Sequence, residues 1–213
     1  MKAYLGFITF ACTITFIFLG VTNWLTTPHT LWFVHTILPL LLFIITVYCM
    51  SKKAYTLHAT LCSLVLISYL AYHNIIDSPE VFWLPYPLFP LVAWPIIMAV
   101  RHQLRAFPVA VIGSICTIVY YGMLNMSLSP GYPWVIYPTY AVLWWPLTLF
   151  HIRKRTFMSF SVTSSLFSIV FFITVNIVST PHTIWCIYPI FAILWWPLTV
   201  YIFVYKKKQC VDQ

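Results

Sequence analysis

Charged side chains are scarce in this sequence of 213 residues: 7% of them are charged, and only three are acids. A water-soluble domain carries about 25% charged residues because its surface faces water. Here 62% of the residues are hydrophobic, and the mean hydropathy is +0.92. The composition therefore excludes an ordinary soluble domain and predicts a surface that faces lipid over most of its area.

Catalytic and ion-coupling signals are also lacking. No Asp, Glu, Lys or Arg lies within the long apolar runs, and this argues against carboxylate-driven transport and voltage sensing. The sequence has no P-loop, HExxH or GxSxG motif and no pair of acids suited to acid–base catalysis. The loops are too short to hold a soluble catalytic domain. We therefore expect a protein that is not an enzyme and has no cofactor or metal.

Paired cysteines are missing as well. The six cysteines form no CxxC motif and no secreted disulfide framework. We interpret them as small packing residues: Cys12, Cys49, Cys62, Cys116, Cys186 and Cys210. The net charge of +8 does not indicate a nucleic-acid partner, because the basic residues form small clusters between apolar runs.

The sequence does contain an internal repeat of 51 residues. Three residue types recur four times at this spacing: Asn23, Asn74, Asn125 and Asn176; Pro28, Pro79, Pro130 and Pro181; Trp32, Trp83, Trp134 and Trp185. Repeats three and four agree at 11 of 17 positions from their tryptophans onward, whereas the first repeat has drifted. We predict repeat units at residues 1–51, 52–102, 103–153 and 154–213, the last with a short basic tail.

Each repeat holds two apolar runs, and a membrane span needs about 20 residues. The sequence therefore predicts an all-α polytopic membrane protein of eight transmembrane helices, arranged as four tandem parallel hairpins. The expected helices are 3–22, 54–73, 107–124 and 157–175 for the first run of each repeat, and 31–50, 83–100, 134–150 and 185–204 for the second. The first run lacks a clear cleavage site and has counterparts in every repeat, so we interpret it as a retained span.

The placement of charge supports eight crossings. If every run crosses, all eleven Lys and Arg lie on one side of the bilayer, and Asp77 and Glu80 lie on the other. Cytoplasmic loops collect Lys and Arg. We therefore expect a plasma-membrane protein with both termini in the cytoplasm.

The turn within each hairpin has the pattern Asn-x4-Pro-x3-Trp, as in Asn176, Pro181 and Trp185. Asparagine often ends a helix, proline fits the first turn of the next helix, and tryptophan prefers the headgroup level of a bilayer. We interpret the pattern as helix stop, turn and interface anchor. The alternative is that the four asparagines form a ligand site.

Two further sets of repeated positions lie inside the runs. Small residues in the first run of each repeat predict helix–helix contact faces, since membrane helices pack closely through small side chains: Cys12, Ser63, Ser114 and Ser165. Tryptophan–proline pairs in the second run predict kinked helices with buried rings, which could shape a pocket: Trp94-Pro95, Trp145-Pro146 and Trp196-Pro197.

Most of the seven histidines are expected to be interfacial, among them His151 beside a basic cluster. His35 and His73 are both predicted near the turn side on different helices. Two histidines at one depth can ligate haem, which makes a haem-binding redox protein a third, weaker hypothesis.

The hairpin pattern resembles the bacterial 2TM domain, a family of short two-helix modules with a poorly defined role. The residues that carry the resemblance are Asn176, Thr180, Pro181, Trp185, Pro189 and Trp195/Trp196, and again Asn125, Pro130, Trp134, Pro138 and Trp144/Trp145. The chain departs from that family in having Trp-Pro in place of a glycine-rich Gly-Trp stretch, and in carrying four copies. The resemblance implies two-helix hairpins and adds little about function.

Two functional hypotheses follow. The first is a small envelope protein that binds lipid, a hydrophobic peptide or a membrane protein within the bilayer, as an accessory or immunity-type factor. The second is a pore or facilitator for a neutral solute, formed by four pseudo-symmetric repeats and lined by the small-residue faces.

Overall fold

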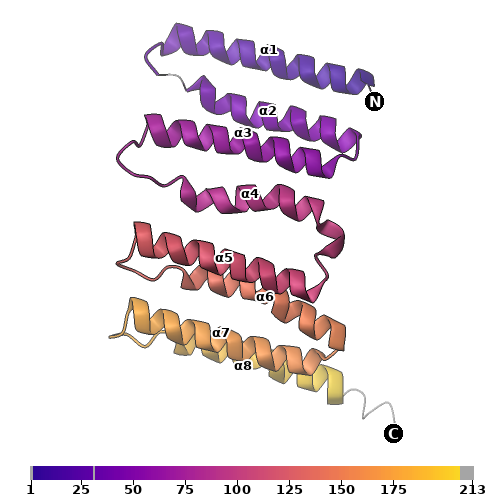
Figure 1. The fold of residues 1–213 in the computed structure, drawn as a ribbon, viewed down its shortest axis with the longest axis vertical. Helices are drawn as coiled ribbons and strands as arrows, with labels where there is room; N and C mark the ends of the chain where they lie inside the picture. Colours follow the sequence, from indigo (N-terminus) through magenta and orange to yellow (C-terminus); the bar gives the residue numbers. More distant parts are fainter. Residues whose placement is uncertain (1, 31, 207–213) are drawn as a thin grey trace. The chain divides into compact units, whose positions relative to one another are not determined.

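The computed structural model describes residues 2–30 and 32–206, which form eight α-helices and no strand (Figure 1). The helices are α1 (Lys2–Thr26), α2 (Phe33–Ser51), α3 (Tyr55–Ile76), α4 (Pro85–Ala99), α5 (Phe107–Leu128), α6 (Ile136–Lys154), α7 (Phe157–Ser179) and α8 (Ile187–Val200). A short 3₁₀ helix (Arg101–Gln103) follows α4, and a π-helical stretch (Tyr201–Lys206) continues α8. The all-α prediction is confirmed, and each helix overlaps its expected range, with ends shifted by a few residues.

Five of the described helices are long and apolar enough to cross a membrane: α1 from Gly6, α2, α3, α5 and α7. Helices α4 and α8 are apolar but shorter, and α6 has Arg153 and Lys154 in its last turn. Prolines explain the shorter helices in part, because α4 begins at Pro85 and contains Pro90 and Pro95.

The chain divides into two compact units, α1–α4 and α5–α8, with the boundary at Arg101, next to the predicted end of the second repeat. Within each unit the main helix contacts join neighbours in sequence: α1 with α2, α2 with α3 and α3 with α4; α5 with α6, α6 with α7 and α7 with α8. Short turns make these neighbours antiparallel (Figure 1). Each unit is therefore an open succession of hairpins.

Most side chains buried between the helices are small, whereas many large apolar side chains point outward. Cys49, Ala59, Ala110 and Ser164 are fully buried, while Phe7 is 67% exposed. Small side chains let helix backbones approach closely, and lipid solvates large apolar ones as well as a protein core does. This distribution is typical of helices that pack within a bilayer.

Each turn between the two helices of a hairpin is organised by one asparagine side chain. Its amide nitrogen donates to the backbone carbonyls of the residues four and seven positions later, and its oxygen accepts from the backbone N–H ten positions later. The same three bonds form at Asn74, Asn125 and Asn176, all between 2.6 and 3.3 Å. All four side chains are buried. The turn therefore provides hydrogen-bond partners for its own backbone carbonyl and N–H groups, which a chain beside lipid requires.

The turn tryptophans also bond within the turn. The indole N–H of Trp32 donates to the hydroxyl of Thr27, and Trp134 and Trp185 donate to the hydroxyl five residues before each of them, at 2.6–2.8 Å. The sequence predicted interface anchors, and the structure adds that these N–H groups have a side-chain partner within the turn. A serine or threonine five residues before each of these tryptophans is the sequence feature from which the bond could have been predicted.

The turns between hairpins within each unit are tight and use a left-handed residue. Lys53 and Arg155 have φ of 54° and 50° and are 102 residues apart, at equivalent places in the repeat. The next residue's N–H bonds back to the carbonyl five positions earlier: Ala54 to Cys49 at 3.0 Å and Thr156 to His151 at 3.4 Å. This pattern is the Schellman motif, which satisfies the last carbonyls of α2 and α6.

Replacing a turn asparagine should destabilise its hairpin. Asn125→Ala removes three hydrogen bonds from a buried site, and at about 0.5–1.5 kcal/mol for each bond we expect a loss of about 2–4 kcal/mol. Unfolding in mixed micelles measures it. The control is Met126→Ala, whose side chain is 80% exposed and should change stability little. Equal effects of the two substitutions would show that the asparagine does not hold the turn.

Candidate functional site

The small residues predicted to form contact faces are all buried: Cys12, Ser63, Ser114 and Ser165. The hydroxyl of Ser114 lies 2.8 Å from the carbonyl of Ala110 and 3.2 Å from that of Val142 on α6. The hydroxyls of Ser63 and Ser165 are buried and have no hydrogen-bond partner among the described residues. These positions lie in helix contacts inside each unit.

Gly113 shows how close α5 and α6 come. A Cβ atom at this glycine would lie 2.7 Å from Cζ3 of Trp145, closer than carbon atoms approach without strain. The indole N–H of Trp145 also donates to the carbonyl of Leu104 at 3.3 Å. Trp145 is therefore wedged between the helices of its hairpin and the chain that leads into α5.

The other tryptophan–proline pairs are in different surroundings. Trp94 is half-buried, with its ring edge-on to His58 at 5.6 Å. Trp196 contacts Phe160 at 5.7 Å but remains 38% exposed. The expectation of a buried ring is thus wrong for Trp196, because no described helix of its unit packs over the outer side of α8. Pro146 lines an open groove of about 340 Å³ between α5, α6 and α7; Pro95 and Pro197 lie inside α4 and α8.

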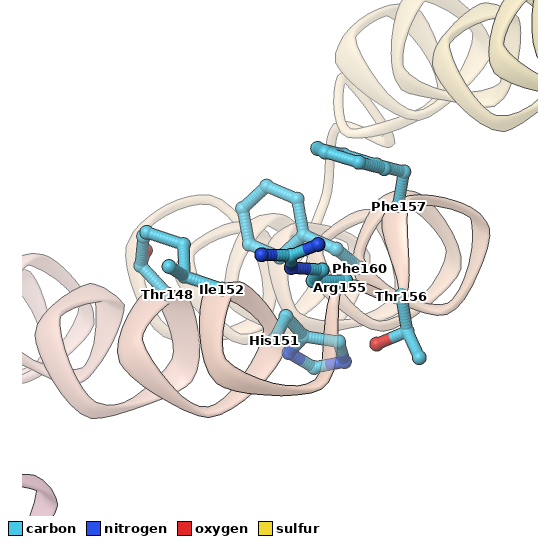
Figure 2. A pocket seen from close by; sticks show the side chains of 7 residues that line it. All are labelled: Thr148, His151, Ile152, Arg155, Thr156, Phe157 and Phe160. Carbon is cyan, nitrogen blue, oxygen red and sulfur yellow. The ribbon is translucent and has the colours of Figure 1, made fainter.

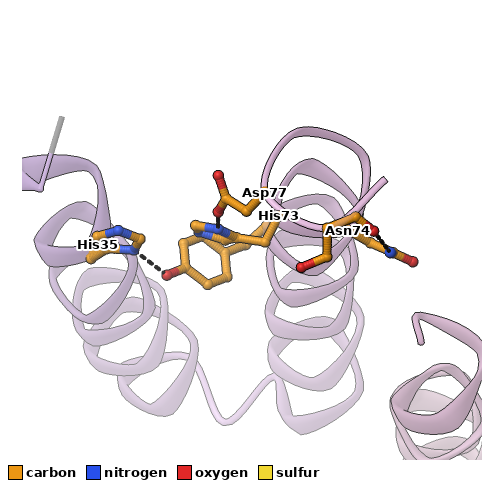
Figure 3. Close-up of polar contacts among 6 residues, drawn as sticks. His35, His73, Asn74 and Asp77 are labelled. Carbon is orange, nitrogen blue, oxygen red and sulfur yellow. Dashed lines mark hydrogen bonds and ion pairs between the residues drawn. The ribbon is translucent and has the colours of Figure 1, made fainter. Parts of the chain in front are cut away.

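A polar cluster joins α2 to α3 at the turn side of the first unit (Figure 3). Nδ1 of His35 lies 2.8 Å from the hydroxyl of Tyr69, and Nδ1 of His73 pairs with the Asp77 carboxylate. The two imidazole rings stack with centroids 4.9 Å apart. They line a pocket of about 210 Å³ that Trp32 also borders.

The sequence correctly placed His35 and His73 at one depth. Their faces are in contact, however, so no macrocycle fits between the rings as they stand. Nε2 of His73 is buried and has no partner among the described residues. The arrangement does not provide the pair of opposed histidines that a haem needs.

The second unit has a neutral version of this junction. The residues 102 positions after His35 and Asp77 are Tyr137 and Ser179. The hydroxyl of Tyr132 bonds to both, at 2.8 and 2.6 Å. The hydrogen bond with Ser179, followed by that with Tyr137, lowers the pKa of Tyr132. The histidine–carboxylate chemistry therefore belongs to the first unit.

A second polar site lies between α6 and α7, at the basic side of the second unit (Figure 2). His151 is 5% exposed. Its Nδ1 lies 3.0 Å from the carbonyl of Leu147, and its Nε2 lies 3.4 Å from the hydroxyls of Ser159 and Thr163 on α7. The sequence predicted a histidine at the membrane interface, and the structure adds that its side chain is buried between α6 and α7. The sequence feature that could have predicted this burial is the pair of hydroxyl residues, Ser159 and Thr163, spaced four apart on α7.

His151 forms the floor of a pocket of about 260 Å³. The wall combines three polar residues with three apolar ones: Thr148, Arg155 and Thr156; Ile152, Phe157 and Phe160. Neighbouring cations are engaged elsewhere, since Arg153 donates to the carbonyl of Arg105 at 3.0 Å and the Lys154 ammonium lies 4.2 Å from the centre of the Phe150 ring. The pocket thus has one cation, hydroxyls and an apolar wall.

Comparisons of the chain with protein-family models, with curated proteins and with solved structures found no match.

Alanine at Gly113 should destabilise the second unit. The added methyl overlaps Trp145, and overpacking of this kind costs about 1–3 kcal/mol. Gly122→Ala is the matched control on the same helix, because no atom lies within 4 Å of its added Cβ, and alanine is the better helix former by about 1 kcal/mol. Thermal unfolding in detergent should show a lower melting temperature for Gly113→Ala and an equal or higher one for Gly122→Ala than for the unsubstituted protein. Trp145→Phe should reduce the cost of Gly113→Ala; equal behaviour of both glycines would contradict the close contact.

Proposed function

We propose that this chain is a non-catalytic plasma-membrane protein that crosses the bilayer eight times, with both termini in the cytoplasm, and binds an anionic phospholipid. The crossings are supported by the one-sided placement of Lys and Arg and by the five helices long and apolar enough to span. The self-contained asparagine turns suit short connections at a membrane surface. The proposal treats the four hairpins as repeats of one module, like the 2TM domain that they resemble.

The observation on which the proposal of lipid binding rests is the pocket at the α6–α7 turn. Arg155 lines it, and its guanidinium makes no hydrogen bond or ion pair with the described residues. A guanidinium matches phosphate oxygens with two parallel donors. Thr148 and Thr156 add hydroxyls beside it. The polar part of the pocket therefore fits a phosphodiester headgroup.

The rest of the pocket fits the lipid tail. Phe157, Phe160 and Ile152 form its apolar wall. The turn that contains Arg155 would lie at the cytoplasmic surface, where anionic lipids are concentrated and basic pockets between helices bind their headgroups. An acyl chain could follow Phe160 along α7 into the hydrocarbon layer. Headgroup and tail would thus contact the pocket in their usual order of depth.

The eight-span topology can be tested with inserted epitope tags. A tag between Lys52 and Lys53 should be protected from antibody in intact spheroplasts, whereas a tag after Gly131, an exposed residue of the α5–α6 turn, should be labelled. Permeabilised cells provide the control for tag expression. Labelling of the Lys52–Lys53 tag in intact cells would reject this topology.

Arg155→Ala should weaken binding of phosphatidylglycerol. Losing a charged hydrogen-bond donor removes about 1.5–3 kcal/mol, so affinity should fall at least about tenfold. Native mass spectrometry of the purified protein titrated with the lipid measures the bound fraction. The matched control is Lys154→Ala, which removes the same charge from a side chain that does not line the pocket. Equal losses in the two variants, or equal binding of phosphatidylcholine, would overturn the lipid site.

A further inference from the structure

The contact between α6 and α7 joins the second helix of one hairpin to the first helix of the next. Its centre is aromatic: the rings of Tyr140 and Phe171 stack at 3.9 Å and 12°, and Phe167 lies 5.0 Å from Tyr140 and 6.0 Å from Trp144. The Tyr140 hydroxyl bonds to Ser168 at 2.9 Å. These contacts define two complementary faces, one on α6 and one on α7.

The α6 face occurs again on α8, where no described residue of its unit covers it. The residues 51 positions after Tyr137, Tyr140 and Trp144 are Tyr188, Phe191 and Trp195. They are exposed by 73%, 65% and 54%. An open groove of about 490 Å³ lies on this face, lined by Tyr188, Phe191 and neighbouring aliphatic side chains.

The α7 face occurs again on α1. The residues 153 positions before Phe160, Phe167 and Phe171 are Phe7, Ile14 and Phe18. All three are exposed, by 67%, 50% and 64%. Thr15 occupies the position of Ser168, but Phe191 occupies that of Tyr140 and has no hydroxyl, so the hydrogen bond between Tyr140 and Ser168 has no counterpart between these two faces. The first helix of the chain thus has the face that an α8 surface would need.

We propose that the α8 face of one copy of this chain binds the α1 face of a second copy, in the same way that α6 binds α7. Apolarity alone would leave both faces to lipid, but these faces repeat, at the 51-residue spacing, the apolar positions of an interface formed inside the chain. Two of the repeated side chains differ, since Phe191 replaces Tyr140 and Ile14 replaces Phe167. Both halves belong to one sequence, so a second copy supplies the missing side of each.

The geometry suits two copies inserted in the same orientation. Helix α8 runs in the direction of α6 within its unit, and with the proposed topology α1 would enter the membrane from the same side as α7, because each is the first helix of its hairpin. Two copies with the proposed topology therefore present α8 and α1 antiparallel and at the same depth, as the α6–α7 contact requires. A contact between two different faces is heterologous, so it can extend into a row of copies or close into a ring.

Cysteine cross-linking in membranes tests this interface. In a background with the native cysteines replaced by alanine, Phe18→Cys and Phe191→Cys are placed on two copies that carry different tags. These positions correspond to the stacked Phe171 and Tyr140. We expect an oxidised dimer that carries both tags, and no dimer from either variant alone. The control pairs Phe18→Cys with Val170→Cys, which is 62% exposed beside Phe171 and should give no dimer.

Three outcomes would overturn the proposal. The first is the absence of a mixed dimer, provided that sedimentation in detergent of the chain without cysteine also finds monomers. The second is a dimer from Phe191→Cys alone, which would mean a symmetric contact between two α8 helices. The third is a cross-link within one chain that bears both substitutions, with no dimer, which would mean that the chain closes on itself.

Discussion

The fold depends on one requirement: where two helices meet in a hairpin beside lipid, the backbone groups of the turn must find partners without help from bulk water. One asparagine side chain meets this requirement for each hairpin, binding two carbonyls and one N–H across ten residues. Because the amide uses both of its hydrogens in this way, the turn stays short. Short turns in turn keep the two helices of each hairpin adjacent and antiparallel, and the small residues along them allow close contact.

Much of this architecture could be predicted from the sequence, because its signals are local. The spacing of Asn23 and its counterparts, the apolar runs and the proline positions gave the helices and their order. Contacts between helices were harder, since they depend on which face turns inward. The burial of His151 depends on hydroxyls of another helix. The exposure of Trp196 depends on the outer side of α8, over which no described helix of its unit packs. Neither fact is contained in the 51-residue spacing alone.

The two units show how one pattern supports different chemistry. At the turn side, the first unit has two stacked histidines and a carboxylate where the second has tyrosine and serine hydroxyls. At the basic side, the second unit has a buried histidine at the position of Cys49 in the first. Positions in helix contacts carry small or aromatic side chains in both units, whereas the side chains at the junctions between hairpins differ from one unit to the other. Function is therefore most readily sought at these junctions, where the proposed lipid pocket also lies.

The left-handed turn residues combine a strained backbone with a positive charge. Lys53 and Arg155 adopt a conformation that glycine accepts freely and that costs other L-residues about 1–2 kcal/mol. Both sites nonetheless carry a cation. A positive charge at the surface helps to fix the direction in which new helices enter the membrane, and glycine cannot provide it. With the proposed topology, each of these two turns thus combines about 1–2 kcal/mol of backbone strain with a charge that favours correct insertion.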